Sequence, residues 1–81
     1  MQRFFLDFHS QNVVTRDWEG MLLPDVAAAT ISATSSLRAL AAEQLPKGER
    51  LLITAILIQD ERRKFVGEVT IAEAVVPLLK P

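Results

Sequence analysis

The sequence predicts a small α+β domain with the element order β-β-α-β-β, in which a four-stranded antiparallel sheet carries one long helix on one face. Two short segments of strand-like sequence come first, a long segment with helical periodicity follows, and a second strand-like pair comes after it. The chain has 81 residues, which is enough for one core, so we expect residues 1–81 to form a single domain.

The first strand pair is expected before the helix. Residues 3–9 predict a strand because their side chains alternate between two faces, and residues 10–12 predict a polar turn. Residues 13–17 begin with two valines and predict the returning strand of a hairpin. Gly20 then predicts a break, at a backbone angle that glycine adopts at little cost.

The long helix is predicted to begin at Pro24-Asp25 and to run to about Gln44, because Asp25 can cap the free N–H groups of the first turn. Leu45 precedes Pro46, which disfavours helical angles there. Apolar residues recur at three- and four-residue steps and form one stripe: Val26, Ala29, Ala33, Leu37, Leu40, Ala41 and Leu45.

The second strand pair is predicted at residues 50–58 and 64–70, and the first of these strands is apolar on both faces. A two-residue turn at Glu61-Arg62 would place Phe65 opposite Ile58, on the face that the helix covers. A different turn length would exchange the two faces. Thr70 and Glu73 have capping-box spacing, so a short C-terminal helix is expected over residues 71–76, ending at Pro77.

The segments Asp17-Trp18-Glu19-Gly20 and Leu23-Pro24-Asp25, after the strand Arg-Phe-Phe-Leu-Asp-Phe-His, resemble a family of short bacterial proteins. The family is common in soil alphaproteobacteria and is classed only as a domain of unknown function. The resemblance extends from about Arg3 to Val75, and it implies the same fold but no activity. A second, architectural similarity is to small antitoxin domains, which place a hairpin, a Pro-Asp helix start and further strands in this order.

Two positions depart from the pattern of the resembled family. Its members usually carry an acidic residue where this chain has Trp18, and often a glycine in the last hairpin turn, where this chain has Glu61-Arg62-Arg63. These departures leave the predicted fold unchanged.

Composition excludes several classes of function. The chain has no cysteine, which excludes disulfide scaffolds, thiolate metal sites and cysteine nucleophiles and suits the cytoplasm. The N-terminus does not resemble a signal peptide, and no apolar stretch is long enough to span a membrane. The formal net charge is −1, so nucleic acid is not a favoured partner. The basic run of residues 62–64 follows Asp60 and Glu61 directly and is interpreted as a solvated turn.

No residue is assigned a catalytic, cofactor-binding or metal-binding role, and we expect a protein that is not an enzyme and needs no cofactor. Asp7 and His9 share a strand face, and Asp17 or Glu19 could complete a metal or acid–base site, but a solvated hairpin edge explains them more simply. The lone tryptophan, Trp18, is expected to cover the edge of the core rather than to anchor a contact.

The predicted function is a small, soluble, non-enzymatic interaction module that self-associates as a homodimer. One helix covers only one face of the sheet, while the strand at residues 50–58 is apolar on both. The C-terminal helix could cover the second face or join the contact. The alternative is an antitoxin-like or regulatory domain that binds an unidentified protein partner or nucleic acid. The candidate interface residues are Phe5, Leu51, Ile53, Leu57, Val66, Leu78 and Leu79.

Overall fold

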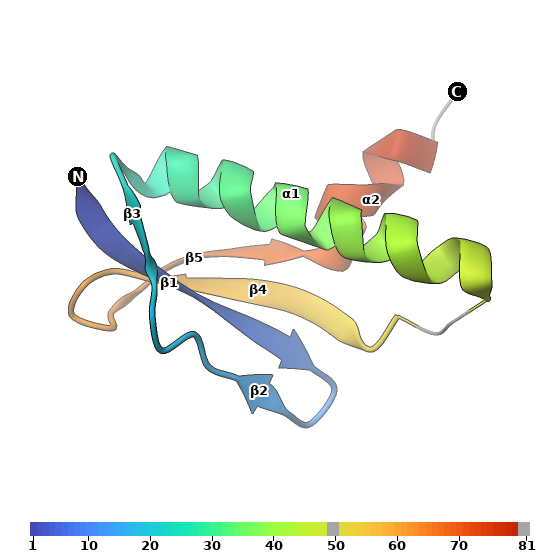
Figure 1. The fold of residues 1–81 in the computed structure, drawn as a ribbon, viewed down its shortest axis with the longest axis horizontal. Helices are drawn as coiled ribbons and strands as arrows, with labels where there is room; N and C mark the ends of the chain where they lie inside the picture. The colour runs from blue at the N-terminus through green and yellow to red at the C-terminus, as the bar shows by residue number, and fades with distance from the viewer. Residues whose placement is uncertain (49–50, 80–81) are drawn as a thin grey trace.

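The computed structural model describes residues 1–48 and 51–79, with a nine-residue first strand and a 19-residue helix as its longest elements (Figure 1). The elements in chain order are β1 (Gln2–Ser10), β2 (Val14–Thr15), β3 (Met21–Leu23), α1 (Val26–Gln44), the 3₁₀ turn η1 (Leu45–Lys47), β4 (Ile53–Gln59), β5 (Phe65–Thr70) and α2 (Ile71–Leu79).

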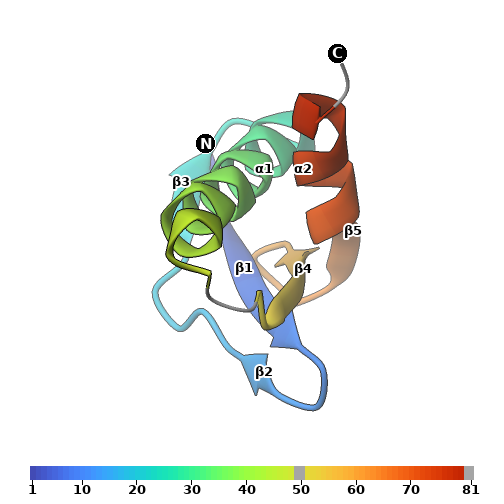
Figure 2. The same ribbon diagram turned by 90° about the vertical axis from the view of Figure 1, so that its right-hand side faces the viewer.

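The antiparallel sheet has the strand order β2-β1-β4-β5, and β3 pairs with the N-terminal end of β1. Both helices lie on the same side of the sheet (Figure 2). The predicted α+β class, with its long helix and short C-terminal helix, is therefore confirmed. The returning strand differs from the prediction, since it splits into β2 and β3, which pair with opposite ends of β1.

The start of α1 follows the prediction. Asp25 is the N-cap residue, and its Oδ1 accepts a hydrogen bond from the backbone N–H of Ala28 at 2.8 Å. This contact satisfies one of the backbone donors that the first turn leaves free. At the other end, Pro46 lies in the 3₁₀ turn, and Gly48 follows it at a φ of 71°.

The core lies between the helices and the sheet. Alanines of α1, Ala29, Ala33 and Ala41, are buried on the stripe that the sequence predicts, and Leu37 is buried among them. Their small side chains let the helix approach the sheet closely, where larger side chains fill the remaining space. The sheet contributes Phe4, Leu6, Ile56, Ile58 and Val69, and α2 contributes Ala74 and Val75.

The last hairpin has a different turn from the predicted one. The backbone N–H of Asp60 donates to the carbonyl of Lys64, and that of Arg63 donates to the carbonyl of Asp60, both at 2.9 Å. The loop thus has three residues, and the last of them, Arg63, has a φ of 63°. A three-residue hairpin loop normally places its third residue in this left-handed region.

A β-bulge follows this turn and corrects the predicted register. Ile58 pairs with Gly67, and Gln59 pairs with Phe65, so Val66 is the extra residue. Phe65 therefore lies on the face opposite the helices, not opposite Ile58 as predicted. Val66, predicted on the uncovered face, packs against the core instead.

A second bulge corrects the start of β4. His9 pairs with Ala55 but Ser10 pairs with Ile53, so Thr54 is the extra residue. Ile53 and Leu51 consequently pack against the core rather than on the uncovered face. The strand was predicted from residue 50, which lies outside the described residues, and it begins at Ile53.

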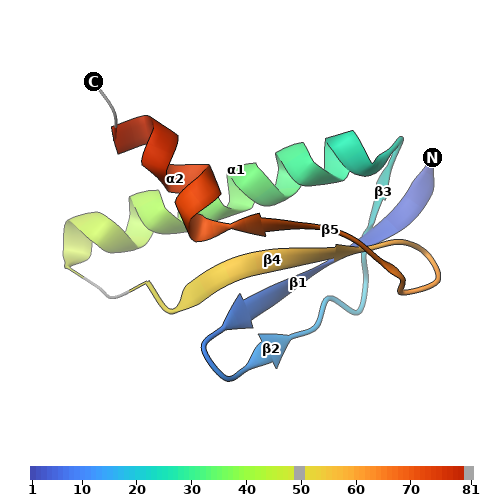
Figure 3. The same ribbon diagram turned by 180° about the vertical axis from the view of Figure 1, so that it is seen from behind.

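The C-terminal helix packs beside α1 and does not cover the second face (Figure 3). Arg38 of α1 donates from Nε to the carbonyl of Ala74 at 2.8 Å. Thr70 and Glu73 form the predicted contact, with the Glu73 N–H donating to Thr70 Oγ1 at 3.1 Å. The predicted end at Pro77 was wrong, because this residue lies inside α2. In the described part of the chain, neither helix has the length and apolar character needed to cross a membrane.

The cap at Asp25 gives a direct test of the helix start. Asp25→Ala should lower the free energy of unfolding by about 1 kcal/mol, because a first-turn N–H loses its acceptor. Asp25→Asn keeps an acceptor oxygen and is the matched control, which should stay close to wild type. Equilibrium urea unfolding measures both, and equal midpoints for the alanine variant and wild type would contradict the assignment of Asp25 as the cap.

Candidate functional site

The sheet face opposite the helices, here called the open face, carries the candidate site. The described residues place both helices on the other side, so this face is uncovered by them (Figures 1 and 3). The strand register orders its side chains in three rows across β1, β4 and β5, which are Phe5-Gln59-Phe65, Asp7-Leu57-Glu68 and His9-Ala55-Thr70.

The guanidinium of Arg63 reaches from the last hairpin across the open face. Its Nη1 donates to Gln59 Oε1 at 3.1 Å and to Asp7 Oδ1 at 3.3 Å, and its Nη2 donates to the carbonyl of Asp17 at 2.6 Å. It also stacks on the ring of Phe5, with the guanidinium carbon 3.7 Å from the ring centroid. One side chain therefore joins the last hairpin to the first strand pair.

Asp7 is the partner that makes this contact important for stability. Its exposed fraction is only 2%, and its Oδ1 accepts a hydrogen bond from the Asp17 N–H at 2.8 Å as well as the one from Arg63. A buried carboxylate is costly unless it is paired and hydrogen-bonded. Arg63 and the Asp17 N–H supply that pairing.

Asp17 closes the gap between β2 and β3, where β1 has no strand partner on that side. Its Oδ2 accepts a hydrogen bond from the Leu6 N–H at 3.1 Å, in the place of a ladder bond. Its Oδ1 accepts from the N–H groups of Gly20 at 3.0 Å and Glu19 at 3.2 Å. The Asp17 carboxylate therefore shapes the turn and protects an exposed sheet edge.

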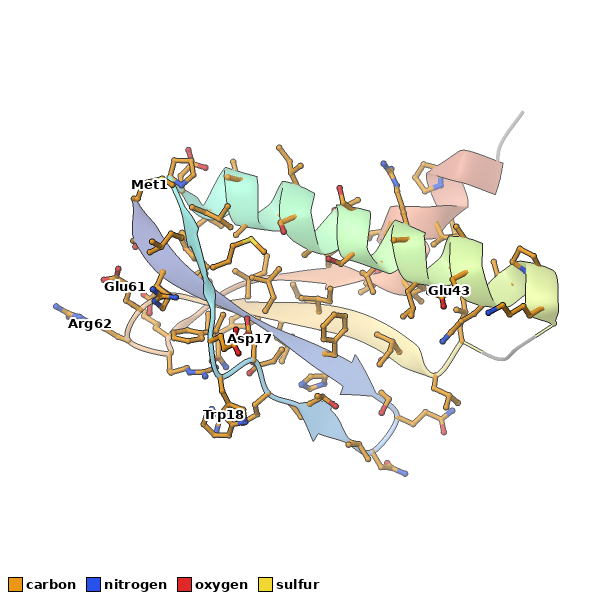
Figure 4. All side chains as sticks on the ribbon, in the orientation of Figure 1. Met1, Asp17, Trp18, Glu43, Glu61 and Arg62 are labelled. Carbon is orange, nitrogen blue, oxygen red and sulfur yellow. The ribbon has the colours of Figure 1, made fainter. Side chains whose placement is uncertain are left out.

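Trp18 projects from this turn into solvent on the side away from α1 (Figure 4). Its exposed fraction is 75%, so the expectation that it covers the core edge was wrong. The guanidinium carbons of Arg16 and Arg63 lie 5.3 and 5.6 Å from its ring centroid, within the range of a cation–π contact. The Asp17 carboxylate fixes the backbone of this turn, and the turn holds Trp18 in its exposed position.

The predicted interface residues divide into three groups. Phe5 and Leu57 lie on the open face as expected, and both are half-buried. Leu51, Ile53 and Val66 pack against the core instead, as described above. The side chains of Leu78 and Leu79 lie outside the described residues.

The sequence did not predict that two apolar side chains of the open face are exposed to solvent. Phe65 has an exposed fraction of 59%, and Trp18 is more exposed still. The alternation of β5 predicted the wrong side for Phe65, because it gives no sign of the bulge at Val66. For Trp18 the only available signal was its position in a turn, where exposure is common.

The metal or acid–base alternative is not favoured by these contacts. The structure does bring Asp7 and Asp17 together, but their oxygens accept hydrogen bonds from backbone N–H groups and Arg63. Among residues 1–48 and 51–79, no group of three or more His, Asp or Glu side chains is arranged to hold a metal ion.

The family model described as "Domain of unknown function (DUF6894)" matches residues 3–72. The chain belongs to this family. The match covers every element from β1 to β5, the whole open face and the first residues of α2. No curated protein and no solved structure matches the chain. Family membership thus agrees with the resemblance described from the sequence, and it assigns no activity.

Gly20 allows a sharp test of the turn that carries Trp18. It has a φ of 72°, and an added Cβ would lie 2.7 Å from Arg3 Cγ and 2.9 Å from the carbonyl oxygen of Phe4. Gly20→Ala should therefore destabilise the fold by about 3 kcal/mol or more, from left-handed strain together with a backbone clash. Gly48→Ala is the control, because its φ is 71° and nothing lies near the added Cβ.

The Gly48→Ala variant should lose only about 1 kcal/mol, since it carries the strain without the clash. Thermal or urea unfolding of both variants measures the difference. Equal losses would mean that the turn around Gly20 is not packed against β1 as described.

Arg63 can be tested with two substitutions that separate its side chain from its backbone. Arg63→Ala should lower the free energy of unfolding by about 2–3 kcal/mol, because it leaves the buried Asp7 carboxylate without its cation. Arg63→Gly should recover about 1 kcal/mol of that loss, because glycine adopts a positive φ freely. A glycine variant at least as stable as wild type in urea would contradict this, because the guanidinium contacts would then contribute no more than the strain that glycine relieves.

Proposed function

We propose that the protein is a small, non-enzymatic interaction module that forms a homodimer through its open face. The observation that carries the proposal is the exposure of Trp18, three-quarters of whose surface is in contact with solvent while two arginines and a closed backbone turn hold it in place. A large apolar side chain on a preorganised support loses little conformational freedom on binding.

The composition of this surface supports a protein partner. Tryptophan and arginine are the residues most enriched at the energetic centres of protein interfaces. Trp18, Phe65 and half-buried Leu57 provide apolar surface, and charged residues such as Glu68 and Lys64 stand around them. An apolar centre with a polar rim is the usual anatomy of such a contact.

A second copy of the chain suits the charges around this surface. Arg16, Arg63 and Lys64 are positive, while Glu19, Glu61 and Glu68 are negative. In a two-fold contact each patch meets its own copy, so a surface of mixed sign can pair its charges in both directions. A homodimer therefore needs no partner of unusual charge. A cysteine-free chain fits a reducing compartment, and we propose a cytoplasmic location on that basis.

The positions that depart from the resembled family pattern meet on this surface. The guanidinium of Arg63 lies 5.6 Å from the ring of Trp18, although the two residues are far apart in the sequence. We therefore expect this part of the open face to be where the chain differs from its relatives. Such a difference would alter the partner or the strength of the contact and leave the fold unchanged.

A regulatory or antitoxin-like domain that binds nucleic acid is the second candidate. The observation in its favour is that Trp18 and Phe65 are exposed beside Arg16 and Lys64, since aromatic platforms with cations bind single strands. The nearby carboxylates of Glu19, Glu61 and Glu68 act against it, because binding of a phosphate backbone requires net positive charge. Binding of a labelled single strand that weakens steeply as salt rises would favour this candidate.

The oligomeric state tests the main proposal. Light scattering coupled to size exclusion should give about twice the chain mass of 9.0 kDa at micromolar concentration. Trp18→Ala and Leu57→Glu should each shift the protein toward monomer, because the first removes the exposed anchor and the second places a charge in the contact. Ile31→Glu is the matched control, since Ile31 is 68% exposed on α1, on the other side of the sheet, and should leave the dimer intact.

The fluorescence of Trp18 gives an independent readout, because the chain has one tryptophan and no tyrosine. Its emission should shift to shorter wavelength as concentration rises through the dimer transition. A wild-type protein that stays monomeric at high micromolar concentration, with unchanged emission, would rule out self-association through this face.

A further inference from the structure

A cavity of about 350 Å³ opens on the helix side of the sheet, away from the open face. It lies between α1 and the segment that connects β2 to β3. Its apolar lining, here called the floor, consists of Leu6, Phe8 and Met21. Its polar lining, here called the rim, consists of Thr15, Arg16, Asp17 and Ser36. Its volume is at the lower end of the range of small-molecule sites, and an apolar lining with a few polar groups is typical of them.

The chain path explains why this space is left unfilled. The strand that returns from β2 leaves the sheet between Arg16 and Gly20, where the Asp17 side chain replaces the missing ladder bond. On the other wall, α1 contributes the small side chain of Ser36. The opening is therefore a consequence of the same turn that presents Trp18 on the opposite side.

The floor can adapt to an apolar guest. Leu6 is buried and Phe8 is half-buried, so a ligand on this floor would be in contact with the edge of the core. Met21 is 43% exposed, and its sulfur accepts a contact from the Ser32 hydroxyl at 3.5 Å. An unbranched, partly exposed methionine changes rotamer easily and fits ligands of differing shape.

The rim offers hydrogen-bond donors. Thr30 and Thr34 of α1 donate their hydroxyls to the carbonyls of Val26 and Thr30, whereas the Ser36 hydroxyl has no hydrogen-bond partner among the described residues. Arg16 is exposed and contacts the Trp18 ring, which leaves its N–H groups free to donate.

The one acidic group on the wall is already engaged. The Asp17 carboxylate accepts three backbone N–H groups, from Leu6, Glu19 and Gly20. These contacts disperse its charge and leave it little capacity for a ligand. The groups at the rim that can still bind a ligand are therefore hydrogen-bond donors, and one of them, Arg16, carries a full positive charge.

We propose that this cavity binds an amphipathic monocarboxylate, whose alkyl or aryl body lies on the apolar floor and whose carboxylate pairs with Arg16 at the rim. The Ser36 hydroxyl would donate to the same carboxylate, since charge-assisted hydrogen bonds are the strong ones at such sites. The cavity and the open face lie on opposite sides of the sheet, and Arg16 is the residue that they share, because it lines the cavity while its guanidinium carbon lies 5.3 Å from the Trp18 ring centroid. Pairing with the ligand carboxylate would therefore require the guanidinium to turn from the Trp18 ring toward the cavity.

Sodium octanoate is a suitable probe, and octylamine, with the same chain and the opposite charge, is its control. In a titration followed by the amide signals of the labelled protein, octanoate should cause saturable shifts at Leu6, Phe8, Met21 and Ser36. Octylamine should bind at least tenfold more weakly, because it meets the guanidinium of Arg16 with a like charge.

Two variants locate the site. Arg16→Gln should weaken octanoate binding at least fivefold, and because Arg16 is exposed the fold should be retained. Ser36→Leu fills the cavity and should abolish saturable binding, while the amide spectrum should remain that of a folded protein. Leu57→Glu, which alters the open face without touching the cavity lining or Arg16, should leave octanoate binding within twofold of wild type even where it dissociates the dimer.

Three outcomes would overturn the proposal. These are the absence of saturable shifts at millimolar octanoate, equal or tighter binding of octylamine, and wild-type affinity in Arg16→Gln. The first would mean that the cavity binds no such ligand. The second and third would mean that binding is not directed by the guanidinium.

Discussion

The contact between the Arg63 guanidinium and the buried Asp7 carboxylate joins parts of the chain that are far apart in the sequence. Asp7 lies in β1, Asp17 in the turn that leaves the sheet, and Arg63 in the last hairpin. A carboxylate with 2% of its surface exposed requires these partners, because neither water nor a distant charge can replace them. The three-residue hairpin loop places the arginine at a φ of 63°, and the strain of this position for a residue other than glycine is offset by its pairing with Asp7.

The same turn links the two candidate sites. The backbone of Asp17 faces the open side of the sheet, where its carbonyl accepts from Arg63 and its N–H donates to Asp7. Its carboxylate lines the cavity on the helix side and supports the positions of Gly20 and Leu6. Of its two neighbours, Trp18 projects on the open face, and Arg16 lines the cavity while its guanidinium contacts the Trp18 ring. One short segment therefore sets the geometry of both surfaces.

Much of the fold was predictable because its signals are local. Asp25 caps the helix through a residue three positions away, and the alanine stripe of α1 is visible in one segment of sequence. The contacts among Asp7, Asp17 and Arg63 were not predictable, because these residues come together only after the sheet forms. The faces of β4 and β5 were predicted only in part. Alternation holds from Ala55 to Ile58, but each of two bulges inserts one residue, and one residue is enough to change the side of every residue beyond it.

Those bulges also change the physical basis for self-association. From the sequence, the argument depended on a strand that is apolar on both faces, with Leu51, Ile53 and Val66 left uncovered. The structure packs these three residues against the core, so the broad apolar face is smaller than the alternation implied. What remains exposed is concentrated in Trp18 and Phe65, at the end of the sheet that Arg63 crosses. A contact of this kind depends on a few anchors rather than on area, and truncation of one anchor removes a large share of its binding energy. If the proposed homodimer forms through such an interface, it should form and dissociate with concentration, because each protomer has its own core.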